Sequence, residues 1–297
     1  MNKRYLAYLS ALGAAFFYSL NQIYSKRLVK LLGALASLVL IYAVLVVLDF
    51  LICYLFGDFS IPSQRVFFEI ILLSLVSASA MFFLLKGLGY LPVGINVTLA
   101  NLSPIFLTIF TLLSTGKLPP PEKLFSIFLL LFSIYLVTFD EGGKKGHSRW
   151  AYLYPLLTAV GWGFSGWETY RLVNQYNVNP LGLAFYTSLY MFVIFFASLL
   201  GIYGKKGLQI LKKGIKNTST LKWAFLVGVI TSMGYILSIV AFKWVPPEEA
   251  PVIEATFAVS TPLSAILSYF LLGETLNSRQ ILGVSLSFLS LVLFFLS

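Results

Sequence analysis

The sequence predicts an all-α polytopic membrane protein with ten transmembrane helices in two inverted five-helix repeats. Three observations lead to this fold class. Of the 297 residues, 59% are hydrophobic and only 11% are charged, and a soluble chain of this length could not bury so much apolar surface. Apolar runs of about 20 residues, enough to cross the hydrocarbon core as a helix, recur along the whole chain. Features of the first half also return in the second half in the same order.

The apolar runs are continuous and do not alternate with polar residues, so they indicate helices and not strands. A single plainly hydrophilic break, "DEGGKKGHSR" at 140–149, lies near the middle. It divides the chain into a first repeat (1–140), a connecting loop (141–149) and a second repeat (150–297). The predicted spans are residues 5–25, 33–56, 66–87, 93–115, 123–140, 150–172, 180–203, 221–243, 250–272 and 280–297.

The net charge of +10 comes with basic clusters that lie between apolar runs, such as residues 25–30 and 204–216. That placement favours anchoring at anionic lipid headgroups over binding of nucleic acid. Cys53 and His147 are the only cysteine and histidine, so a Cys/His metal site has no ligands to draw on. The sequence also carries no phosphate loop and no nucleophile–base arrangement. We therefore expect no metal, no cofactor and no enzymatic activity.

A short string repeats after the first span of each half. "KRLV" at 26–29 matches "YRLV" at 170–173. In that register Tyr18 of the first span lies opposite Trp162 of the sixth, and Asn21 lies opposite a serine. Tyr18 and Trp162 are predicted either as walls of a central cavity or as plain packing residues, and Asn21 is a further candidate for substrate binding.

A second match, "SPIF" at 103–106 with "TPLS" at 261–264, places Asn96 opposite Glu254. An odd number of spans per half means that the second half enters the membrane upside down. In inverted-repeat transporters the binding site lies between the halves near the midplane. The order of these features predicts such a site here.

Pro104 and Pro262 occupy matching positions in the fourth and ninth spans. Proline removes a backbone hydrogen bond and frees a carbonyl of the preceding turn, so we expect a structural kink at each position. The kinks serve either helix packing alone or a cavity that the freed carbonyls line.

Glu254 is the carboxylate of the ninth span, and a charge well inside hydrocarbon usually faces a partner or a wet cavity. It is predicted either to snorkel to the interface or to bind substrate and couple protons opposite Asn96. Lys86, near the end of the third span, either snorkels as well or supplies a cation to the site.

Other polar residues carry structural expectations. Asp49 lies deep enough to need a partner, and Glu168 is expected to pair with Arg171 three residues on. Small residues four apart, Gly161 with Ser165 and Gly228 with Ser232, predict close helix contacts.

The chain resembles the EamA branch of the drug/metabolite transporter superfamily. The resemblance spans nearly the whole chain and rests on "AVGWGFSG" (159–166), "STPLSAILSYFLLGETL" (260–276) and the "LPV" entry to the fourth span (91–93). It implies ten helices in two inverted repeats. The first half departs from the family pattern at "TGKLPPPEK" (115–123), where a Gly-Glu pair would be expected, so Glu274 is expected to cap a helix end.

From these features and the resemblance we expect a secondary transporter, an exporter of an amino acid or related zwitterion by alternating access. The alternatives are an uptake carrier for a quaternary amine or other organic cation and, from another class, a non-transporting scaffold or a lipid-acting membrane enzyme. The expected partners are a small-molecule substrate, the lipid bilayer and protons, but no nucleic acid. The expected location is the plasma or inner membrane of a bacterial or archaeal cell.

The orientation stays open in the sequence. Most lysines and arginines lie in loops on the side away from the termini, so the positive-inside rule places both termini outside. The resemblance instead implies that both termini are cytoplasmic.

Overall fold

The computed structural model describes residues 3–61, 63–88, 90, 96, 99–138, 149–272 and 277–296. Within these ranges the chain forms helices joined by short turns and contains no strand, as the sequence predicts. The elements are α1 (Lys3–Leu32), α2 (Ala34–Phe56), α3 (Gln64–Leu88), α5 (Ser103–Thr115), α6 (Pro121–Thr138), η1 (Arg149–Tyr152), α7 (Leu153–Asn174), α8 (Pro180–Tyr203), α9 (Lys205–Lys216), α10 (Thr218–Phe242), η2 (Pro247–Glu249), α11 (Ala250–Ala258), α12 (Ser260–Leu272) and α13 (Ser278–Leu296).

Each predicted span overlaps one or two of these helices, although the start of the fourth span falls largely outside the described residues. By length and composition alone, five stretches of the described residues could cross a membrane, and α5 and most of α13 form shorter apolar helices. The five stretches are Ala34–Phe56, Gln64–Gly87, Pro180–Tyr203, Thr218–Phe242 and Pro247–Leu267.

Helix ends follow local chemistry. Asn179 caps α8, since its side-chain oxygen accepts hydrogen bonds from the amides of Leu181 (2.9 Å) and Gly182 (3.4 Å), and a proline follows at the first helical position. Asn217 caps α10 in the same way through the amide of Thr220 (3.2 Å). These caps fix where the seventh and eighth spans begin.

The two basic clusters were predicted to lie between the helical spans, but both are helical in the structure. α1 was predicted to end at residue 25 but continues to Leu32, so the cluster at 25–30 forms its last turns. Gly33 then ends the helix with a φ of 77°. The cluster at 204–216 forms α9, a separate helix between α8 and α10. Lysine and arginine are good helix formers, and charge alone did not signal a loop.

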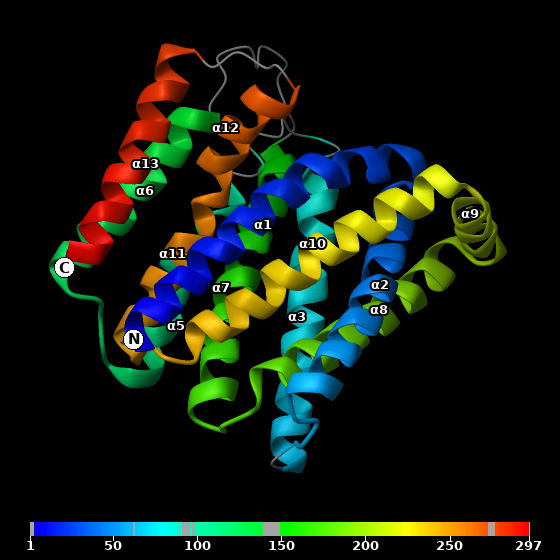
Figure 1. Cartoon of the computed structure of the whole chain (residues 1–297), viewed down its shortest axis with the longest axis horizontal. Helices are drawn as coiled ribbons and strands as arrows, with labels where there is room; N and C mark the ends of the chain where they lie inside the picture. The colour runs from blue at the N-terminus through cyan, green and yellow to red at the C-terminus, as the bar shows by residue number, and fades with distance from the viewer. Residues whose placement is uncertain are drawn as a thin grey trace.

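The helix contacts of one half reappear in the other. Counting spans, α7 corresponds to α1, α8 to α2, α10 to α3, α11 and α12 to the span that contains α5, and α13 to α6. α1 packs on α10, and the corresponding α7 packs on α3. α2 packs on α8 and α6 on α13, each on its own counterpart, and the second pair lies at the left of Figure 1. Exchanging the halves leaves these contacts unchanged.

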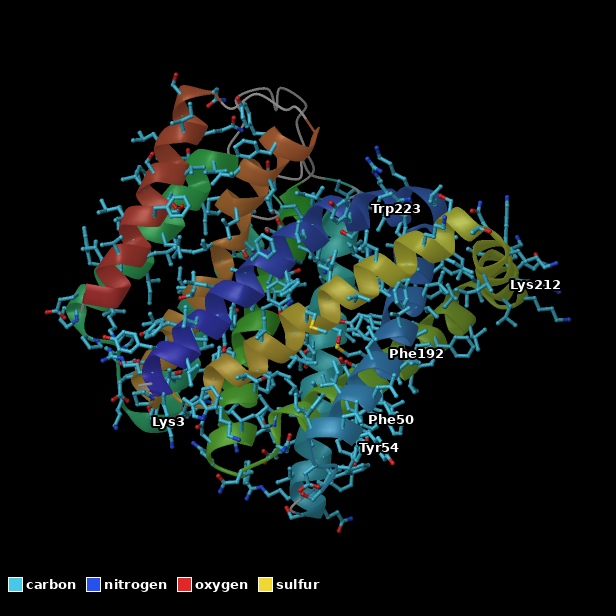
Figure 2. All side chains as sticks on the ribbon, viewed as in Figure 1. Lys3, Phe50, Tyr54, Phe192, Lys212 and Trp223 are labelled. Carbon is cyan, nitrogen blue, oxygen red and sulfur yellow. The ribbon has the colours of Figure 1, made fainter. Side chains whose placement is uncertain are left out.

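The outer surface of the bundle is apolar. Phe56 of α2 is 77% exposed, and Figure 2 shows Phe50 and Tyr54 at the outer edge of the same helix. The interior around α11 is densely packed, with Val252, Ile253 and other residues fully buried. A chain that exposes large apolar side chains outward and buries polar ones inward suits a lipid environment.

Candidate functional site

The fourth and ninth spans are each interrupted by one or two residues just before their prolines. α11 ends at Ala258 and α12 begins at Ser260, while the turn before α5 ends at Leu102. Pro104 and Pro262, where a structural kink was predicted, each lie in the first turn of the helix that follows the interruption. The reason is that proline fits the first turn of a helix, where its missing N–H costs no hydrogen bond.

The two interruptions lie beside each other, where α5 of the first half contacts α11 of the second. α5 contacts α11, and Ser103 Oγ donates a hydrogen bond of 2.7 Å to Glu254 Oε1. Asn101 Nδ2 donates to Thr261 Oγ1 at 2.5 Å. Ser103 and Thr261 occupy matching positions directly before the two prolines. Each hydroxyl therefore bonds across the boundary between the halves.

Glu254 lies between helices and not at a lipid interface. It is 8% exposed, so the snorkelling interpretation is wrong. A Cβ on Gly166 of α7 would lie 3.0 Å from Glu254 Oε2, and it would also meet Phe242. The carboxylate is thus enclosed by α5, α7 and α11.

A row of aromatic rings lies beside the carboxylate. Tyr18 of α1 meets the ring of Phe257 edge-on at 6.2 Å, and Phe257 meets Phe242 at 5.6 Å. The Tyr18 hydroxyl donates to Ser238 Oγ at 3.1 Å. Tyr18 therefore reaches the same region as Glu254, whereas Trp162 is half-buried on α7.

A polar row continues from this region along α1 and α12. Gln22 Nε2 donates to Ser260 Oγ (3.3 Å), and Ser264 Oγ donates to Gln22 Oε1 (2.8 Å). The sequence analysis missed Gln22 and Ser103. Gln22 lies one helical turn after Tyr18 on the same face, and Ser103 directly precedes the predicted kink, so both carried a usable signal.

Asn96, Asn21 and Lys86 lie elsewhere. The structure does not bring Asn96 to Glu254: Asn96 is buried against the end of α3, where its Nδ2 donates to the carbonyl of Leu84 at 3.0 Å. Asn21 donates to Thr231 Oγ1 at 3.1 Å and so joins α1 to α10.

Lys86 does not supply a cation to Glu254. Its side chain is exposed, and its Nζ lies 4.9 Å from the centre of the Tyr154 ring and 5.8 Å from that of Phe82. It lies in the last turn of α3, where a long stem reaches outward and an aromatic face attracts the ammonium group.

The structural expectations for Asp49 and Glu168 are confirmed. Asp49 is buried and accepts hydrogen bonds from Ser188 of α8 (2.5 Å) and Ser232 of α10. Arg171 Nη1 donates to Glu168 Oε2 at 2.8 Å. Glu274 and His147 lie outside the described residues.

The small-residue contacts are confirmed as well. A Cβ on Gly161 would lie 2.8 Å from Ala80 of α3, and Ser165 Oγ lies 2.8 Å from Ser77 Oγ of the same helix. Gly228 lies directly against Val44 of α2. These glycines let α7 approach α3 and α10 approach α2 closely.

Charged contacts join the halves at the end where α1, α3 and α6 begin. Glu249 of η2 pairs with Arg4 (2.7 Å) and with Lys123 (2.9 Å), whose side chain is 1% exposed. Arg171 also approaches Glu69 of α3 at 3.5 Å. The sequence analysis missed Lys123 because a lysine at the start of a span is ordinarily interfacial.

Two further side-chain contacts lie at this end of the molecule. Lys117 lies 3.7 Å from Glu248. Trp167 Nε1 donates to Ser114 Oγ at 2.9 Å, so α7 is joined to the end of α5. Among the described residues, no group of three or more His, Cys, Asp or Glu side chains could hold a metal ion.

Known proteins share this two-half helical architecture. The model of the EamA-like transporter family matches residues 5–139 and 149–296, so each half matches it separately. A solved structure described only as "Crystal structure of protein" superposes with a TM-score of 0.77 at 14% sequence identity, over 98% of this chain and 96% of that chain. At that identity the likeness shows the fold alone. A comparison with curated proteins found no match.

Proposed function

Because the chain belongs to the EamA-like transporter family, we propose that it exports a small polar metabolite, an amino acid or related zwitterion, by alternating access. The family is one of multi-pass membrane transporters with two repeats. The observation that carries the proposal is Glu254, a carboxylate buried where the two broken spans meet. We assign the protein to the plasma or inner membrane of a bacterial or archaeal cell.

A buried carboxylate in a membrane is costly, by about 2.5–3.5 kcal/mol on insertion scales, so its retention points to a role. An ionised carboxylate can accept about four hydrogen bonds, and Ser103 supplies one to Glu254. The remaining capacity suits the ammonium group of a substrate. Protons can occupy the same carboxylate when substrate is absent, which would couple export to proton entry.

The substrate's own carboxylate requires positive partners, and Lys86 does not supply one here. α5 and α12 begin at the two breaks, and the N-terminal end of a helix carries partial positive charge. Broken helices hold anionic substrate groups in this way in other transporters. Glu254 and these helix ends together suit a zwitterion, with the aromatic row beside its side chain.

Alternating access requires that the halves move against each other. The helix contacts stay the same when the two halves are exchanged, which supports an inverted relationship between the halves. Every ion pair described above between the halves lies at one end, around Glu249, Glu248 and Arg171. These contacts support a state that is closed at this end, and transport would break and remake them.

A second candidate, uptake of a quaternary amine, is favoured by one observation. The rings of Tyr18, Phe257 and Phe242 lie in a row beside Glu254, and aromatic faces with a carboxylate bind organic cations. The two candidates predict different substrates: a quaternary amine lacks the carboxylate that the helix ends would hold.

Flux in proteoliposomes tests the proposal. Liposomes with the purified protein are loaded with single amino acids, quaternary amines or neutral metabolites, and counterflow of labelled substrate is measured with and without a pH gradient. We expect counterflow of a zwitterion that a pH gradient drives. Glu254→Gln should abolish the pH-dependent flux, whereas Glu122→Gln, at the exposed start of α6, should leave it intact.

Other outcomes would overturn the proposal. Flux of quaternary amines alone would favour the uptake carrier, and undiminished flux with the same pH profile in Glu254→Gln would reject the coupling role. No flux across the whole panel would favour a scaffold or a lipid-acting enzyme. A C-terminal reporter that is active on only one side of the membrane would fix the orientation.

A further inference from the structure

The helix α9 has three distinct faces. Its sequence, "KKGLQILKKGIK", has five lysines and no acidic residue. Gly207, Leu211 and Gly214 are buried toward the bundle, and the lysines point away from it. Figure 2 shows Lys212 at the outer edge of the molecule. Leu208 and Ile215 are exposed although they are apolar. At 100° per residue, these two side chains lie between the buried face and the lysine face.

The buried face fixes α9 to the bundle closely. A Cβ on Gly214 would lie 2.9 Å from Leu32 at the end of α1, and one on Gly207 would lie 3.0 Å from Leu199 of α8. α9 also contacts α2 and α10. A connection that served only as a solvated linker would not need glycines for so close an approach.

The exposed apolar edge continues surfaces that face lipid. Ile202 at the end of α8 is 60% exposed, and Leu221 at the start of α10 is 42% exposed. α9 lies between these two residues in the chain, with Leu208 at 46% and Ile215 at 51%. Nearby, Trp223 stacks on Tyr24, an aromatic pair of the kind that marks the membrane interface. α9 therefore lies where the apolar helices α8 and α10 end and begin.

We propose that α9 is an interfacial helix that binds anionic phospholipid headgroups. Leu208 and Ile215 enter the acyl boundary, and Lys205, Lys206, Lys212, Lys213 and Lys216 meet the phosphates. Charge complementarity selects this occupant, because a helix with basic residues on its polar face and apolar ones on its edge lies in the plane of an anionic leaflet. Each lysine near such a surface changes lipid preference by about fivefold. This assignment does not depend on the transported substrate.

The lipid preference of the full-length protein tests the assignment. The protein is placed in nanodiscs of equal parts phosphatidylglycerol and phosphatidylcholine, and the lipids retained on it are identified by native mass spectrometry. One variant combines Lys212→Gln, Lys213→Gln and Lys216→Gln. Its matched control removes the same charge at the other end of the molecule through Lys3→Gln, Lys117→Gln and Lys243→Gln.

We expect the α9 variant to lose preference for phosphatidylglycerol by at least about fivefold, and the control to keep most of it. An equal loss in both variants would overturn the assignment, because net charge alone would then explain the preference. Unchanged retention in the α9 variant would overturn it as well. The circular dichroism spectrum checks that both variants keep their helices.

A second measurement reports depth and does not rely on the lysine variants. Cys53 is the only cysteine and is buried, so Cys53→Ala gives a background for single spin labels. The collision rates of each label with oxygen and with a water-soluble nickel chelate are compared. A label at Leu208→Cys should collide more often with oxygen, and a label at Lys212→Cys should collide more often with the chelate. Equal access of the chelate to both labels would place α9 in bulk water and overturn the assignment.

Discussion

Ser103 Oγ donates a hydrogen bond to Glu254 Oε1 across the two halves of the chain, at 2.7 Å. The two residues are 151 positions apart, and each belongs to a span that is broken close to it. The bond therefore joins two positions that are not symmetry mates, since Ser103 corresponds to Thr261 and Glu254 to Asn96. One hydrogen bond of Glu254 in the second half is therefore supplied by the first half.

Removal of the Ser103 hydroxyl should impair transport without removing the carboxylate. Ser103→Ala leaves Glu254 buried without this donor, and such a loss costs about 1–3 kcal/mol. We expect lower substrate affinity in counterflow assays, with Ser103→Thr close to the unchanged protein because its hydroxyl remains. Equal substrate affinity in Ser103→Ala and the unchanged protein would show that the bond does not position Glu254.

The carboxylate Asp49 should act in stability and not in transport. It joins α2 to Ser188 of α8 and Ser232 of α10. Ser188→Ala and Ser232→Ala should each lower the free energy of unfolding by about 1–3 kcal/mol, because a buried carboxylate loses a donor. Denaturation in mixed micelles, followed by tryptophan fluorescence, measures this change.

Asp49→Asn is the matched control for the charge. The amide has nearly the same shape but carries no charge to desolvate, so the loss of either serine should cost less in this background. A serine effect of the same size in both backgrounds would mean that packing, and not the carboxylate, sets the cost.

The sequence predicted most of the fold because its strongest signals are physical requirements of a bilayer. Long apolar runs gave the spans, and small residues such as Gly161 gave the close helix contacts. Helix ends were less well predicted. α1 continues through its basic cluster to Leu32 because those residues also favour helix, and α9 was missed because its apolar residues are few.

The candidate site was predicted in part. Glu254 and Tyr18 lie in one region, but Asn96 and Lys86 do not join them. Aligning the two halves in sequence shows which residues are symmetry equivalents, such as Asn96 and Glu254. Symmetry-equivalent residues need not contact each other. The donor to Glu254 comes from Ser103, seven residues after Asn96, because Ser103 begins the helix that contacts α11.

The buried lysine Lys123 should matter far more than its exposed neighbour Lys117. Lys123 is 1% exposed and pairs with Glu249, whereas Lys117 is 58% exposed and lies 3.7 Å from Glu248. Lys123→Met breaks this pair, and breaking a buried pair costs about 3–5 kcal/mol of unfolding free energy. Arg4, which also pairs with Glu249, will offset part of that cost. Lys117→Met should change the free energy of unfolding by about 0–1 kcal/mol.

A second substitution separates charge from packing at this pair. Glu249→Gln added to Lys123→Met removes the carboxylate that has lost its buried lysine partner, so we expect it to recover part of the lost stability in the same denaturation assay. A double variant that is less stable than Lys123→Met alone would contradict the ion-pair explanation.

The last prediction concerns the end of the molecule that the ion pairs close. Lys117 belongs to the first half and Glu248 to the second, and their side chains are 58% and 30% exposed, so reagents can reach both. In a Cys53→Ala background, Lys117→Cys with Glu248→Cys should be joined by a short bifunctional maleimide, and the joined protein should lose flux because the halves can no longer separate here. Each single cysteine variant, treated alike, controls for modification alone and should keep its flux. Full flux in the cross-linked protein would mean that transport does not open this end, because a covalent bridge opposes separation far more strongly than an exposed ion pair, which contributes about 0–1 kcal/mol.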